Sequence, residues 1–185
     1  MKILRLTLAF VVLAAAACAA QDIQFSSTPY AAPAFYANFP APDNDKVTVQ
    51  YSSDEITLKN GGTTTLHDYA LSLHDDQDAF LVLYCDIPNT HGDTAALDAM
   101  LDGALAKLDN AKPGPKFDTT YSGIPARMVI ATGTYSRGQT TFYVTSYHRI
   151  AVQGNRVWQG IVICDHRTSC TETDANKFLN SIKIR

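Results

Sequence analysis

One long helical pattern among many strand patterns is the feature that most constrains the fold of this chain. The apolar residues of the helical stretch recur at helical spacing, and Asp93 stands where a helix cap would be: Leu97, Leu101, Ala104, Leu105 and Leu108. Strand patterns lie on both sides of it, at 47–51, 63–73, 79–85, 116–121, 126–135, 140–152 and 156–164. Parallel neighbours would each need a long crossover, so we predict a mainly antiparallel sheet in an α+β layered domain, with helices on at least one face.

A two-residue turn at Gly154-Asn155 predicts the register of the last hairpin. The register sets Arg149 opposite Gly160, and it places Tyr147, Arg149 and Trp158 on one face of the sheet. We predict a ligand- or partner-binding face at these three residues, because a glycine opposite an arginine leaves room for a ligand or a partner backbone. The alternative is that Trp158 packs under a covering helix.

Residues 1–20 have the pattern of an export signal, with a basic start, an apolar run and small residues before Gln21. Cleavage near Ala20 would release a diffusible protein into the periplasm or the medium. Alternatively, Cys18 ends a sequence similar to a bacterial lipobox, and its lipidation would anchor the protein to a membrane. We expect an exported protein of the bacterial cell envelope, with membrane contact only through such an anchor.

Removal of the signal leaves about 165 residues, enough for one domain with a hydrophobic core. Residues 21–34 are rich in Ser, Pro and Ala and are predicted to form a flexible arm before the domain. The formal charge of −3 becomes −5 once the two cations of the signal are removed. This acidic balance, with dispersed cations, argues against a nucleic-acid partner.

No common catalytic motif, phosphate-binding loop or Cys-x-x-Cys pair occurs in the sequence, and the five histidines are not paired at metal-ligand spacing. We therefore expect no metal, no cofactor and no catalytic site. The alternative is an envelope enzyme, such as a hydrolase, assembled from dispersed groups such as His148, His166 and Asp165.

The cysteines of the domain predict one disulfide, because export leads to an oxidising compartment. Cys164 ends a strand pattern and Cys170 precedes the predicted final helix, so the two can close a short loop. Cys85 would then remain as a buried thiol. Pairing of Cys85 with Cys164 is the competing arrangement.

Several short motifs are similar to those of the exported bacterial relatives of PsbP, the extrinsic subunit of photosystem II, whose fold is also that of a Ran-binding nuclear import factor. They lie at 35–40, 97–108, 123–127, 154–158 and 178–182. The resemblance covers residues 35–185 and implies an antiparallel sheet sandwiched by helices, in proteins that act mainly by binding partners. It implies a non-enzymatic accessory or binding protein for an envelope protein, a lipid or a small ligand.

Overall fold

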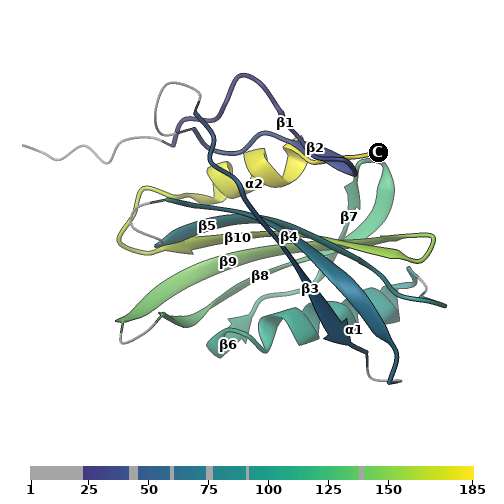
Figure 1. Ribbon diagram of the computed structural model, residues 1–185. Helices are drawn as coiled ribbons and strands as arrows, with labels where there is room; N and C mark the ends of the chain where they lie inside the picture. The colour runs from purple at the N-terminus through teal and green to yellow at the C-terminus, as the bar shows by residue number, and fades with distance from the viewer. Residues whose placement is uncertain (1–22, 42–45, 59–60, 74–76, 91, 138–139) are drawn as a thin grey trace, which may run out of the picture.

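The computed structural model describes residues 23–41, 46–58, 61–73, 77–90, 92–137 and 140–185. An eight-stranded antiparallel sheet forms its centre, in the order β3-β4-β5-β10-β9-β8-β6, and β7 pairs with the remaining length of β8 (Figure 1). The strands are β3 Gln50–Thr57, β4 Thr63–Leu73, β5 Asp78–Asp86, β6 Asp109–Pro113, β7 Phe117–Tyr121, β8 Ile124–Arg137, β9 Thr140–Gln153 and β10 Arg156–Asp165. A second sheet consists of three short strands, β1 Tyr30–Ala31, β2 Phe35–Ala37 and β11 Lys183–Ile184.

Two helices, α1 (Thr94–Leu105) and α2 (Glu172–Ser181), lie on opposite sides of the large sheet (Figure 1). Both begin at a capping residue, and the one at Asp93 was predicted. The Asp93 carboxylate accepts a hydrogen bond from the backbone N–H of Ala96 at 2.9 Å. Thr171 and Asp174 form a reciprocal capping box at the start of α2.

The predicted α+β class is wrong, and so is the implied sandwich of a sheet between helical layers. Strands make up 57 % of the described residues and helices only 15 %, which makes this a β-rich fold with two short helices. Part of the difference lies in segments whose sequences do not alternate like strands. Residues 109–113 form β6 on the edge of the large sheet, and the chain around Phe35 pairs with Lys183–Ile184 at the other end of the sequence.

The large sheet consists of two antiparallel meanders joined side by side. The first contains β3, β4 and β5, and the second runs from β7 through β8 and β9 to β10. After β5 the chain passes through α1 to the far edge, and the second meander returns until β10 pairs with β5. The predicted hairpin register is confirmed, with Trp158 opposite Ala151, Arg149 opposite Gly160 and Tyr147 opposite Val162.

One face of the sheet is covered by α2 and by the N-terminal segment, which together bury a large aromatic core. Its largest fully buried side chains include Phe35, Phe39, Phe80, Trp158 and Phe178. The segment predicted to be a flexible arm contributes from Ile23 onward: Ile23 and Ala32 are buried, and the ring of Phe25 lies edge-on to that of Phe80 at 6.2 Å. This part of the arm therefore stabilises the domain through burial of apolar surface.

The opposite face is covered by α1 over only part of its width. Leu97, Leu101 and Leu105 are buried against a second core that includes Val129 of β8 and Val144 of β9. On this face Cys85 and Val157 are buried, whereas Leu81 and Leu83 of β5 and Ile161 and Ile163 of β10 stay partly exposed. The apolar run 79–85 is thus fully covered on the α2 side and only partly covered on the α1 side.

Cys164 and Cys170 are joined in a disulfide with their Cα atoms 5.3 Å apart, so the predicted pairing is confirmed. Cys85 is a buried free thiol, and burial raises its pKa. The loop between the paired cysteines is also held by the fully buried Asp78, whose carboxylate accepts hydrogen bonds from the Asp165 N–H and the Thr168 hydroxyl, each at 2.8 Å. A disulfide is compatible with an exported protein.

Replacing both Cys164 and Cys170 by serine should lower the free energy of unfolding by up to about 2 kcal/mol, because the short loop regains conformational freedom in the unfolded chain. Urea denaturation of the oxidised wild type and the double variant measures the difference. Dithiothreitol should destabilise the wild type by a similar amount and leave the double variant unchanged. Equal sensitivity of both proteins to dithiothreitol would contradict the prediction.

Among the described residues, no helix is both long and apolar enough to cross a membrane. The predicted signal at 1–20 and the candidate lipidation residue Cys18 lie outside the described residues.

Candidate functional site

The three residues of the predicted binding face lie together on one side of the sheet, but they are inside the protein. Tyr147, Arg149 and Trp158 share the α2 side of the sheet, and all three are buried. The space expected beside Gly160 is occupied, because a Cβ atom there would meet Leu179 of α2 at 2.7 Å and the Tyr121 hydroxyl at 2.8 Å. Gly160 therefore permits close packing of α2 and β7 against β10, and no opening for a ligand is left beside it.

The three residues of the alternative enzyme hypothesis have separate partners. His148 lies 3.4 Å from the side-chain nitrogen of Gln159, His166 contacts the Thr145 hydroxyl at 3.0 Å, and Asp165 pairs with Arg167 at 2.8 Å. The hydrogen bonds described for these residues include none between two of them. In the described ranges, no group of three His, Cys, Asp or Glu residues is placed to hold a metal ion.

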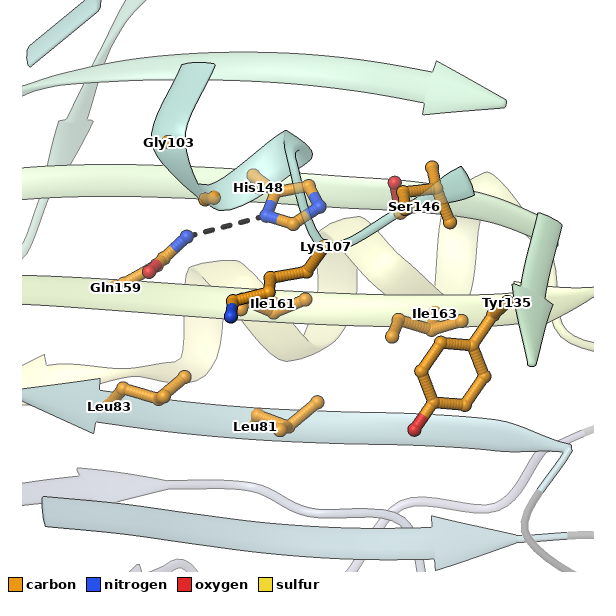
Figure 2. Close-up of a pocket in the computed structure, with 12 residues that line it drawn as sticks. Leu81, Leu83, Gly103, Lys107, Tyr135, Ser146, His148, Gln159, Ile161 and Ile163 are labelled. Atoms are coloured by element: carbon orange, nitrogen blue, oxygen red, sulfur yellow. Dashed lines mark hydrogen bonds between the residues drawn. The ribbon is translucent and has the colours of Figure 1, made fainter. Parts of the chain in front are cut away.

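A groove lies where α1 leaves the sheet uncovered, and it is the best candidate for a functional site (Figure 2). Its volume is about 280 Å³. Apolar side chains of β5 and β10 form one wall, and Gly103 and Ala104 of α1, with Lys107 and Leu108 just after it, border the other. This wall is open because Gly103 has no side chain and Ala104 has only a methyl group. A Cβ atom added at Gly103 would meet nothing within 4 Å.

A few polar groups lie on the floor of the groove among the apolar ones. Ser146 and His148 project from β9, and Gln159 projects from β10 beside them (Figure 2). The hydroxyl of Ser146 donates to the Ala131 carbonyl at 3.3 Å. An apolar cavity with a small number of convergent polar groups is typical of small-molecule binding sites.

The floor of the groove is uncharged because His148 is buried. Burial lowers the pKa of His148 to about 4, so its imidazole is neutral at pH 7. The side-chain nitrogen of Gln159 lies 3.4 Å from Nδ1 of His148, and a neutral imidazole carries one N–H donor and one acceptor nitrogen. The floor thus presents an uncharged N–H donor and the Gln159 carbonyl as an acceptor.

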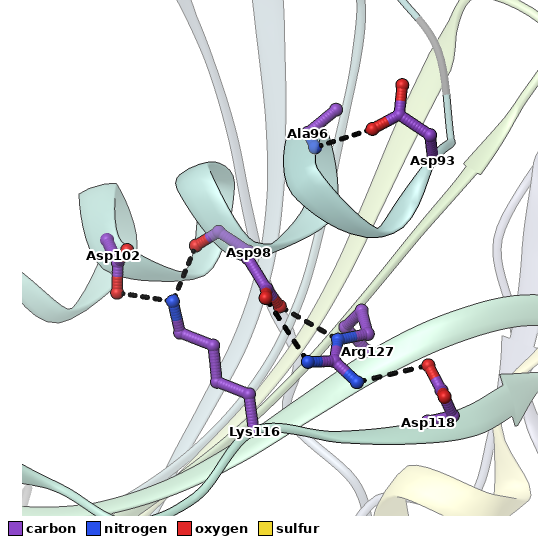
Figure 3. Close-up of polar contacts among 7 residues, drawn as sticks. All are labelled: Asp93, Ala96, Asp98, Asp102, Lys116, Asp118 and Arg127. Carbon is purple, nitrogen blue, oxygen red and sulfur yellow. Dashed lines mark hydrogen bonds and ion pairs between the residues drawn. The ribbon is translucent and has the colours of Figure 1, made fainter.

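An ionic network fixes the edge of α1 that faces away from the groove (Figure 3). Arg127 of β8 donates two hydrogen bonds to the Asp98 carboxylate, at 2.8 and 3.2 Å, and a third to Asp118 of β7 at 3.0 Å. Lys116 reaches Asp102 at 2.7 Å and the Asp98 carbonyl at 3.1 Å. Two-pronged contacts of this kind set orientation as well as distance, so α1 is held on β8 while the groove side stays open.

The groove could not be located from sequence patterns, although one signal points to it. Unbroken apolar runs such as 79–85 predict burial on both faces, and only the arrangement of α1 shows which face lacks a full cover. None of the protein-family models compared with the chain matches it, and the search for similar curated proteins likewise gave no match.

Proposed function

We propose that this chain is a non-enzymatic, exported binding protein of the bacterial cell envelope, and that it holds a small, mainly apolar molecule in the groove beside α1. The observation that supports this most is the partial exposure of Leu81, Leu83, Ile161 and Ile163 along one wall. Covering these side chains with an apolar ligand would remove them from water, which is worth about 25 cal/mol for each Å² of apolar surface.

The floor defines the polar part of the ligand. His148 is neutral and offers an N–H group, and Gln159 is uncharged, so a charged group at this depth would lose hydration without gaining a counter-charge. A carbonyl, ether or hydroxyl oxygen would accept from His148. Lys107 also lines the groove, and its side chain is exposed.

Replacing Ala104 by phenylalanine should weaken binding of N-phenyl-1-naphthylamine, a neutral apolar fluorophore, by about tenfold or more, because the added ring fills the groove. Fluorescence titration of the purified protein measures the affinity. Ala99→Phe is the matched control: Ala99 lies on the same helix, is exposed and does not line the groove.

The control variant should bind like the wild type. Two results would refute binding in the groove. One is undiminished binding by a folded Ala104→Phe variant, and the other is the absence of saturable binding by the wild type.

Location in the envelope and kinship with the PsbP-like proteins are part of the same proposal. The disulfide supports export. The kinship is supported by the packing of the residues that suggested it, since Phe35, Phe39, Trp158 and Phe178 belong to one core. Intact mass of the protein from soluble and membrane fractions, with and without Cys18→Ser, separates a diffusible form from a lipid-anchored one.

A further inference from the structure

A buried arginine without a carboxylate partner lies on the α2 side of the sheet, opposite to the groove. Arg149 is only 5 % exposed. Its guanidinium donates to the Leu179 carbonyl at 3.3 Å and to the Asn180 side-chain oxygen at 2.9 Å, and its third contact is the Met128 sulfur at 3.8 Å. Among the described residues, no carboxylate pairs with it, and its Nε atom has no hydrogen-bond partner.

The end of α2 balances this charge only in part. Leu179 and Asn180 lie in the last turn of α2, where the helix dipole contributes the equivalent of roughly half a negative charge. Among the described residues, the guanidinium therefore has only neutral acceptors and the end of α2 as partners, and a buried charge without a counter-charge is costly. Burial accordingly lowers the pKa of Arg149.

Arg149 borders a pocket of about 410 Å³ that is open to solvent and lined mostly by polar groups. Lys183 of β11 lies at its rim and adds a second cation. The hydroxyl groups of Thr120 and Ser122 belong to the same lining. Because the Ser122 oxygen accepts from the Ile184 N–H at 3.2 Å, its hydroxyl hydrogen is left to donate. No acidic side chain lines this pocket of the described structure.

We infer that this pocket binds a phosphate monoester, with Arg149 and Lys183 as its two cationic contacts and Ser122 as a hydroxyl donor. A phosphate monoester carries nearly two negative charges at pH 7 and several acceptor oxygens, which matches two cations and neighbouring hydroxyl donors. The pocket is larger than a bare phosphate, so the organic part of the ester has room. This site is independent of the groove beside α1.

Isothermal titration of the purified protein with glycerol 1-phosphate, at fixed ionic strength, tests the inference. We expect saturable binding by the wild type and weakening of at least about tenfold in Arg149→Gln, because a hydrogen bond to a charged group is lost. Lys183→Gln should also weaken binding, and because Lys183 is exposed this variant decides the question if Arg149→Gln fails to fold. Lys112→Gln, at an exposed lysine of β6, is the matched control and should bind like the wild type.

Absence of saturable binding by the wild type would overturn the inference, and so would equal affinity of the wild type and Lys183→Gln. Tighter binding of succinate than of glycerol 1-phosphate would overturn the assignment to phosphate. Co-sedimentation with phosphatidylcholine vesicles that contain phosphatidic acid distinguishes two supporting outcomes. Binding to these vesicles as well as to glycerol 1-phosphate identifies a lipid headgroup, and binding to glycerol 1-phosphate alone identifies a soluble ester.

Discussion

Replacing Trp158 by alanine should lower the free energy of unfolding by about 4 kcal/mol, which is near the upper end of the range for single substitutions in a protein core. The indole is 1 % exposed and lies between aromatic neighbours, with ring centroids 4.9 Å from Tyr84 and 6.5 Å from Phe35. Alanine would leave a cavity where β5, β10 and the N-terminal segment meet. Urea denaturation monitored by circular dichroism measures the loss.

Tyr143 provides the matched control for Trp158. It is an aromatic residue on the neighbouring strand β9, but it is 69 % exposed, so Tyr143→Ala should change the stability by less than about 0.5 kcal/mol. Similar losses in the two variants would contradict the description of the core. Binding of N-phenyl-1-naphthylamine by folded Trp158→Ala should equal that of the wild type, because the groove lies on the opposite face.

The stability of the protein should fall by about 3 kcal/mol more in the wild type than in His148→Gln when the pH is lowered from 6.5 to 4. Burial lowers the pKa of His148 from 6.5 to about 4 in the folded protein. Between these two values the unfolded chain binds a proton that the folded protein does not, so stability decreases as the pH falls. Well above pH 6.5 the imidazole is neutral in both states and contributes no pH dependence.

Urea denaturation at half-unit pH steps measures this difference. Comparison with His148→Gln is needed because Asp86 and Asp165, whose pKa values are lowered by hydrogen bonds to Arg156 and Arg167, add their own loss of stability as the pH falls through those values. Parallel curves for the wild type and His148→Gln would refute the burial of His148 as a cause of acid sensitivity.

Local interactions explain which features could be predicted. Asp93 and Thr171 cap helices through contacts within one turn, and the Gly154-Asn155 turn determines the register of a hairpin whose strands adjoin it. The disulfide joins residues only six positions apart. The fold class was missed because strand content depends on partners far along the chain, as in the pairing of Phe35 with Ile184.

The candidate sites were likewise predictable only where they depend on local sequence. Arg149 was identified from the sequence through its position opposite Gly160, yet the expected opening beside it is filled by Leu179 and Tyr121. The groove beside α1 had no sequence motif. Its wall consists of alternate residues of β5 and β10, which pair across more than seventy positions of sequence.

By itself, the sequence determined where the two helices begin and how the last hairpin pairs, and it favoured the pairing of Cys164 with Cys170, because each depends on residues close together in the chain. The tertiary structure alone decided which side of each strand is covered. That outcome depends on the pairing of β5 with β10 and on the anchoring of α1 to β8 by Arg127 and Asp98, and both are contacts between distant segments. The uncovered strip that these contacts leave between α1 and β5 is the groove in which we propose that the ligand binds.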